Sequence, residues 1–82
     1  MKIKYFAWIK NITNLEEEII NDNSIVDIKT LKKYLLSKYP KLEKYMGEDD
    51  LIHVAINLKY TSDNESIKSN DEIAIFPPVS GG

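Results

Sequence analysis

The sequence predicts a two-layer α+β domain, in which one main helix packs across one face of a mixed sheet of four to five strands. Three observations carry this prediction. Residues 2–9 alternate in the manner of a strand, residues 28–39 carry a helical stripe, and two apolar strand-like segments follow at 51–58 and 73–76. With 82 residues, the chain has room for a single core.

The first predicted strand, residues 2–9, has two distinct faces. Ile3, Tyr5, Ala7 and Ile9 lie on one side, and Lys2, Lys4, Phe6 and Trp8 lie on the other. Because the second face turns aromatic at Phe6 and Trp8, we expect that pair to contact a partner. A turn is predicted at 11–14 and a second strand, pairing back on the first, at 15–21.

The main helix is predicted to begin after Asp27, which suits the N-cap position. Apolar residues then recur every three to four positions, at Ile28, Leu31, Leu35 and Tyr39. Pro40 ends the helix, because proline disfavours helical geometry in the residue before it. A further short turn is expected over 41–46, closed by Gly47, and a polar loop over 48–50.

Two more strands are predicted in the second half of the chain. Over 51–58, Ile52, Val54 and Ile56 form one face, whereas Leu51, His53 and Ala55 form the other. Turns are expected at 62–65 and 69–72, with Asn70 a candidate for positive φ, before the final strand at 73–76. If the helix crosses over the sheet, the first and last strands become parallel central neighbours, which is the β-grasp, or ubiquitin-like, arrangement. The domain would then span residues 1–76, followed by an extended tail over 77–82.

Composition excludes several kinds of function. Cysteine is absent and His53 is the only histidine, which argues against thiolate or histidine-rich metal sites and against a Ser-His-Asp triad. The basic residues are all lysine, and the net charge of -2 disfavours nucleic acid as a partner. No long apolar run or signal-peptide core is present, so we expect no membrane partner and a cytoplasmic location.

The C-terminal tail has the composition of a presented segment. Pro77 and Pro78 end the last strand and hold the chain extended, Val79 and Ser80 continue it, and Gly81 and Gly82 end it. Two residues without side chains can enter a tunnel that any larger residue would block. They leave the α-carboxylate as the only reactive group at the tip. A carboxylate is a poor electrophile until it is activated with a nucleotide, and the chain has no phosphate-binding glycine loop of its own.

The sequence resembles the MoaD family, the small sulfur-carrier subunits of molybdopterin synthase. The residues that carry the resemblance lie at both ends of the chain and in the third strand: Ile3-Lys4-Tyr5-Phe6-Ala7, Ala55-Ile56-Asn57, and Asp71 through Gly82. The ending is the specific part of this match. Three positions depart from the usual family pattern, namely Asn70, Lys10 and the segment Leu58-Lys59-Tyr60.

The resemblance implies a function that depends on partners. An adenylating enzyme related to the ubiquitin-activating enzymes would use ATP to convert Gly82 to an acyl-adenylate, and a sulfur donor would make it a thiocarboxylate. Docked into the large synthase subunit, in a heterotetramer, the chain would deliver sulfur to cyclic pyranopterin monophosphate while Gly81 lets the tail thread. Phe6, Tyr60 and Phe76 match or lie near the family's contact surface. The chain itself would bind no cofactor or metal and supply no catalytic group.

Three alternatives remain open at this level. The chain resembles β-grasp sulfur carriers for thiamine or tRNA thiolation in its Gly-Gly ending, although the thiazole carriers rarely end Pro-Pro-Val-Ser-Gly-Gly. It could also be a modifier that forms isopeptide bonds, or an interaction module with an inert tail. An independent enzyme is the least favoured, because a nucleophile, metal ligands and an acid/base pair are all missing.

Overall fold

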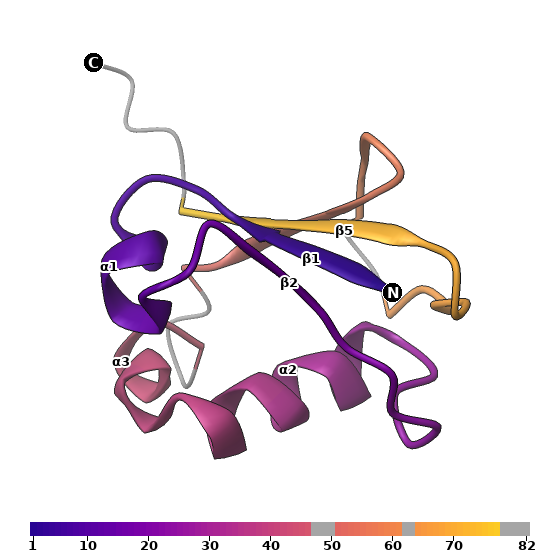
Figure 1. The fold of residues 1–82 in the computed structure, drawn as a ribbon, viewed down its shortest axis with the longest axis horizontal. Helices are drawn as coiled ribbons and strands as arrows, with labels where there is room; N and C mark the ends of the chain where they lie inside the picture. The colour runs from indigo at the N-terminus through magenta and orange to yellow at the C-terminus, as the bar shows by residue number, and fades with distance from the viewer. Residues whose placement is uncertain (47–50, 62–63, 78–82) are drawn as a thin grey trace.

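A five-stranded mixed sheet forms one layer of the computed structural model, and a single long helix lies across one face of it (Figure 1). The structure describes residues 1–46, 51–61 and 64–77. The strand order is β2-β1-β5-β3-β4. The strands are β1 (Lys2–Tyr5), β2 (Glu17–Ile19), β3 (His53–Ile56), β4 (Lys59–Tyr60) and β5 (Glu72–Phe76).

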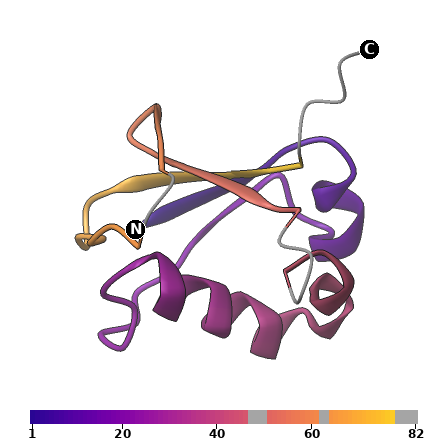
Figure 2. The ribbon, with the colours of Figure 1, turned by 180° about the vertical axis from the view of Figure 1, so that it is seen from behind.

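The centre of the sheet is β5, which pairs on both sides. It runs parallel to β1, with Ile3 opposite Ile73, and antiparallel to β3, with Val54 opposite Ile75. A parallel pair needs a crossover connection, and the α2 helix on one face of the sheet supplies it (Figure 2). The β-grasp arrangement expected from the element order is therefore confirmed.

The α2 helix (Ile28–Lys38) begins and ends where the sequence predicts. Asp27 caps it by accepting a 2.8 Å hydrogen bond from the Thr30 backbone N–H, and the Thr30 hydroxyl oxygen accepts in return from the Asp27 N–H at 3.1 Å. This capping box satisfies donors that the first helical turn would otherwise leave unpaired. A 3-10 turn, η1 (Pro40–Leu42), and the short helix α3 (Glu43–Met46) follow.

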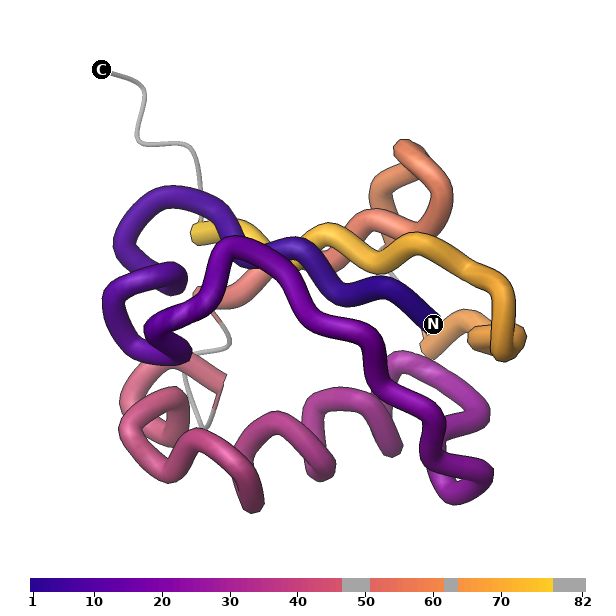
Figure 3. The backbone as a smooth tube through the Cα atoms, viewed as in Figure 1, coloured from indigo at the N-terminus to yellow at the C-terminus, as the bar shows by residue number. Residues whose placement is uncertain are grey.

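Figure 3 shows the backbone of the two layers, the sheet and α2. Buried side chains from both layers form the core. In β1 and β3 the residues predicted for the inner face point into the core, and so does the apolar stripe of α2 from Ile28 to Leu35. Ile67, which stands alone among polar residues in the sequence, also enters the core. Its backbone N–H donates to the Val26 carbonyl at 2.9 Å. The fully buried core side chains are Ile3, Tyr5, Ile9, Leu31, Leu35, Leu42, Ile73 and Ile75.

The first predicted strand is too long. β1 ends at Tyr5, Ala7 takes a positive φ of 54°, and a short helix, α1 (Ile9–Thr13), occupies the region predicted as a turn. The left-handed residue reverses the chain direction, so Ile9 reaches the core from a helix and not from the strand. The prediction that Trp8 shares the outer strand face with Phe6 is wrong for the same reason.

The turns of the second half also differ in part from prediction. Asn70 does not have a positive φ; that conformation occurs at Asn57 (50°) and Leu58 (71°), in a tight turn that separates β3 from β4. The strand predicted over 51–58 therefore covers only His53–Ile56, and the short β4 that follows is the fifth strand that the predicted four- to five-stranded sheet allowed. The strand predicted over 15–21 is confirmed as the shorter β2. Gly47, the 48–50 loop, part of the 62–65 turn and the tail beyond Pro77 lie outside the described residues.

Candidate functional site

The root of the tail is fixed by the central strand. The last residue of β5 is Phe76, and the Phe6 backbone N–H donates to the neighbouring Ile75 carbonyl at 3.0 Å. Pro77 cannot donate to either adjacent strand, so the sheet ends there. The predicted tail residues Pro78, Val79, Ser80, Gly81 and Gly82 lie outside the described residues, and their roles stay predictions.

Aromatic side chains gather on the sheet face opposite α2, around this root. His53 pairs with Phe76 across the β3–β5 ladder, and their rings stack with centroids 5.7 Å apart. Tyr60 of β4 meets the Phe76 ring edge-on at 5.4 Å and is 78% exposed. Phe6, which follows β1, is 46% exposed. We call Phe6, His53, Tyr60 and Phe76 the open-face aromatic surface; an exposed apolar group of this kind is typical of a protein-binding site.

Trp8 is not part of that surface. Its ring lies against Tyr45 of α3 with centroids 4.4 Å apart, and both side chains are half-buried against the core. This contact joins the start of α1 to α3 at one end of the two layers (Figure 1). The structure therefore gives Trp8 a packing role, and its proposed contact with a partner stays a prediction.

Two exposed residues received no site role from the sequence. The alternation of β3 does assign His53 to the face opposite Val54, but only the register with Phe76 reveals the ring stack. Leu58 is 94% exposed because it occupies a turn, whereas an unbroken strand over 51–58 would have placed it in the sheet. The sequence did single out Leu58 in one respect: the segment Leu58-Lys59-Tyr60, which follows Asn57, departs from the usual pattern of the MoaD family.

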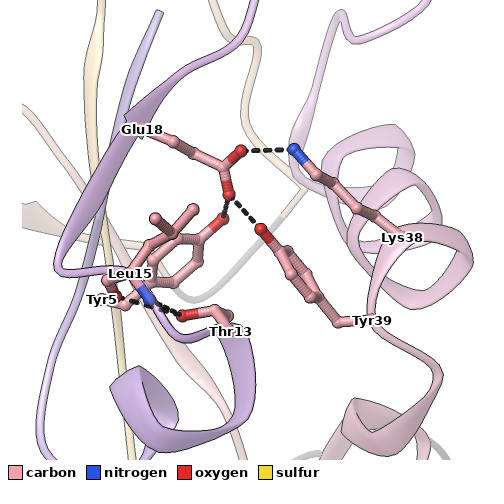
Figure 4. Close-up of polar contacts among 6 residues, drawn as sticks. All are labelled: Tyr5, Thr13, Leu15, Glu18, Lys38 and Tyr39. Carbon is pink, nitrogen blue, oxygen red and sulfur yellow. Dashed lines mark hydrogen bonds and ion pairs between the residues drawn. The ribbon is translucent and has the colours of Figure 1, made fainter.

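A partly buried polar cluster ties β2 to the end of α2 (Figure 4). One Glu18 carboxylate oxygen accepts hydrogen bonds from the hydroxyls of Tyr5 at 2.6 Å and Tyr39 at 2.5 Å. The other carboxylate oxygen pairs with the Lys38 ammonium. Close by, the Thr13 hydroxyl exchanges hydrogen bonds with the Leu15 backbone, which stabilises the turn that leads from α1 to β2. The cluster links β2 to the end of α2, and Glu18 is the shared acceptor for the Tyr5, Tyr39 and Lys38 side chains.

The electrostatics of the cluster favour an ionised Glu18. Burial alone would raise the pKa of Glu18, but hydrogen bonds from Lys38, Tyr39 and Tyr5 outweigh it and hold that pKa below its ordinary value. Burial, followed by the hydrogen bond to Glu18, raises the pKa of the Tyr5 hydroxyl far above its ordinary value. The hydrogen bond to Glu18 likewise raises the pKa of Lys38. At neutral pH the cluster therefore contains one carboxylate, one ammonium and two neutral phenols.

The described residues contain neither a metal-binding cluster nor a membrane-spanning helix. Within 1–46, 51–61 and 64–77, no three His, Cys, Asp or Glu side chains are grouped to hold a metal ion. Over the same ranges, every helix is too short or too polar to cross a bilayer. The described surface offers a sheet with an exposed aromatic group beside Phe76, the last residue of β5.

Sequence comparison places the chain in a known family. The profile of the ThiS family matches residues 3–82. The chain belongs to the ThiS family. Among its curated relatives is the molybdopterin synthase sulfur carrier subunit of Dictyostelium discoideum, which is 35% identical over 88 residues covering 99% of this chain and 94% of the relative.

Solved structures agree with this assignment. SAMP1 from Haloferax volcanii superposes with a TM-score of 0.80 at 27% identity, covering 99% of this chain and 97% of that one. A chain from the complex of subunits 1 and 2 of the molybdopterin-converting factor of Helicobacter pylori superposes with a TM-score of 0.67 at 28% identity, covering 99% of this chain and 96% of that one. The β-grasp fold and the likeness to MoaD-type carriers expected from the sequence are confirmed.

Proposed function

We propose that this ThiS-family chain carries sulfur for molybdopterin synthase as a thiocarboxylate on Gly82. The observation that carries the proposal is the family match over residues 3–82 together with relatives named as sulfur carrier subunits. The fold supports it physically, because the central strand β5 runs directly into the segment that ends in Gly81 and Gly82. The reactive group is a main-chain carboxylate, which explains how a chain without cysteine can carry sulfur.

The proposed chemistry has two steps at the same carboxyl group. A Gly82 carboxylate oxygen attacks the α-phosphorus of ATP and pyrophosphate leaves, which gives an acyl-adenylate. A sulfide equivalent from a donor protein then attacks the acyl carbon and expels AMP, which leaves the thiocarboxylate. ATP and the catalytic groups belong to an adenylating enzyme related to the ubiquitin-activating enzymes. The chain contributes no catalytic side chain, resident cofactor or metal in this scheme, and it acts in the cytoplasm.

Delivery of the sulfur requires docking to the large synthase subunit. The Helicobacter pylori complex of subunits 1 and 2 supports a partner of this kind. The open-face aromatic surface is the proposed contact, because it surrounds the residue from which the tail departs. Burying Phe6, Tyr60 and Phe76 there would hold the tail root while the extended tail enters the active site of the large subunit, where cyclic pyranopterin monophosphate accepts the sulfur. A heterotetramer with two such arms is the expected assembly.

Intact-mass spectrometry provides the direct test. The chain is incubated with its adenylating enzyme, ATP and a sulfur donor, and the expected product gains the mass difference between sulfur and oxygen. Deleting Gly82 should abolish this gain while leaving the melting temperature unchanged, because β5 ends at Phe76. Adding the large subunit and cyclic pyranopterin monophosphate should return the loaded chain to its original mass and form molybdopterin. A chain whose mass never changes would refute the proposal.

Protein modification is a second candidate function. The structural likeness to SAMP1, described in a solution structure from Methanosarcina acetivorans as a small archaeal modifier protein, favours it. The same acyl-adenylate at Gly82 would then be attacked by a lysine amine of a target protein, which forms an isopeptide bond and releases AMP. Peptide mapping of conjugates from the native cells would separate the two candidates, since the carrier function predicts no lysine linked to Gly82.

A further inference from the structure

Leu58 is an apolar side chain that the fold holds in solvent. It occupies the two-residue turn between β3 and β4 and is 94% exposed. Both turn residues have positive φ, as a type I′ turn requires, and glycine is the residue that meets this requirement most easily at the second position. A leucine there is conformationally unfavourable and gains almost no packing within the chain in return. The turn would be more stable with glycine, so the leucine side chain calls for another explanation.

The turn that carries Leu58 is rigidly anchored. The Asn57 side-chain amide donates to Asp71 at 2.9 Å, and its carbonyl oxygen accepts from the Glu72 backbone N–H at 2.9 Å. The Asn57 backbone N–H also donates to the Glu72 carbonyl, at 2.8 Å. These three bonds fix the turn to the start of β5, so Leu58 is presented from a preorganised position at little entropic cost on binding.

The position of the turn links Leu58 to the open-face aromatic surface. The turn rises from the sheet on the side away from α2, at the opposite end of β5 from Phe76 (Figures 1 and 2). Tyr60 lies two residues beyond Leu58 and contacts the Phe76 ring. The floor between them is built of small residues, because Ala55 pairs with both Tyr60 and Ala74. Tyr60 therefore lies between the tail root and the turn that carries Leu58, with Ala55 and Ala74 beside it on the sheet.

We propose that Leu58 is a docking contact that inserts into an apolar socket on the large synthase subunit. This inference rests on the proposed function and adds a contact beyond the aromatic surface. A partner that buries about 800 Å² on this chain covers a patch of roughly 16 Å radius. The five residues from Phe76 back to Glu72 span about 13 Å, at about 3.3 Å per step. A patch centred on the tail root thus reaches the turn, and Leu58 is the side chain that projects there.

Binding measurements with turn variants test the proposal. The Leu58→Gly and Leu58→Asn variants remove the apolar side chain and keep residues that tolerate positive φ, whereas Leu58→Met keeps an apolar side chain. Val26→Ala is the matched control, because Val26 is 55% exposed but precedes α2 on the other layer. The Kd for the large subunit from the same genome is measured by calorimetry, and the melting temperature is measured alongside it.

Opposite changes in affinity and stability are expected. Loss of a buried leucine contact weakens binding about tenfold or more. Leu58→Gly should therefore raise Kd by that factor while raising the melting temperature, and Leu58→Asn should also bind weakly. Leu58→Met and Val26→Ala should bind within about twofold of the parent. A purely structural leucine would instead lower the melting temperature on removal and leave the Kd unchanged.

The outcomes separate this inference from the proposed function. If the parent chain binds the large subunit and the Gly and Asn variants bind equally well, the Leu58 contact is refuted and the proposed function stands. If those variants lose affinity only for the adenylating enzyme, the assignment of the partner is overturned. If the parent chain does not bind the large subunit at all, both the proposed function and this inference fail.

Discussion

The Glu18 cluster allows the geometry of one carboxylate to be tested oxygen by oxygen. Both tyrosine hydroxyls donate to one carboxylate oxygen, and the Lys38 ammonium pairs with the other. Replacing Glu18 with Gln preserves an oxygen for Tyr5 and Tyr39 but turns an NH₂ group toward Lys38. Replacing it with Ala removes the acceptor from all three donors. The two variants should therefore differ strongly in stability.

The magnitudes follow from the burial of each donor. Tyr5 is only 1% exposed, so its hydroxyl would be left without a partner in Glu18→Ala, at a cost of about 1–3 kcal/mol. Tyr39 and Lys38 reach solvent more easily, so the loss of their acceptor lowers the unfolding free energy by only roughly 0.5 kcal/mol each. We expect Glu18→Ala to lose about 2–4 kcal/mol. Glu18→Gln loses only the partly exposed ion pair, at most about 1 kcal/mol.

Urea unfolding at neutral pH measures both variants against the parent chain. With unchanged m-values, the midpoints should fall in the order parent, Glu18→Gln, Glu18→Ala. The double variant Tyr5→Phe with Glu18→Ala is the control, because it removes the stranded hydroxyl and should recover part of the loss. The reasoning fails if Gln is as damaging as Ala, or if Ala costs less than about 0.5 kcal/mol, the range of an ordinary surface change.

Three further predictions concern acid stability, the β3–β4 turn and docking. The folded state lowers the pKa of Glu18 below its ordinary 4.5, so the stability that ionised Glu18 contributes is complete above pH 4.5 and is lost as the pH falls through the folded pKa. The difference in unfolding free energy between the parent and Glu18→Gln should therefore shrink in that acid range. A difference that stays constant with pH would contradict this prediction. Asn57→Ala should lower the unfolding free energy by about 1–2 kcal/mol in thermal unfolding, since it removes two side-chain hydrogen bonds and puts alanine at positive φ. Asn57→Asp should lower it more than Asn57→Gly does, because the new carboxylate lies against Asp71. Tyr60→Ala should change stability by less than about 0.5 kcal/mol yet weaken binding of the large subunit by about 2 kcal/mol, and equal binding would remove Tyr60 from the interface.

Periodicity explains why much of the fold was predictable. The stripe from Ile28 to Leu35 and the N-cap at Asp27 are local signals, and the α2 bounds follow them. The parallel pairing of β1 with β5 follows from the order of the elements, since a connection that crosses the sheet lets both strands run in the same direction.

The failures occur where backbone conformation depends on tertiary contacts. Ala7 takes a positive φ that its residue type does not favour. The alternating sequence pattern runs on past Tyr5, so it predicts a strand that is longer than β1. Asn57 and Asn70 each lie in a turn of the second half, but the two turns are different. Asn57, which bonds to Asp71 and Glu72, adopts the left-handed conformation that composition alone would equally assign to Asn70. The aromatic surface was only partly predictable, because the stack of His53 on Phe76 depends on strand register.

The central position of β5 also bears on how the chain matures during translation. β1 and β3 flank β5, so neither has its inner neighbour until residues 72–76 have been synthesised. A nascent chain that stops earlier exposes two unpaired strand edges and a core without Ile73 and Ile75, and exposed edges and apolar surface of this kind favour aggregation. A chain that can complete the sheet has therefore already been translated up to the residues that open the tail.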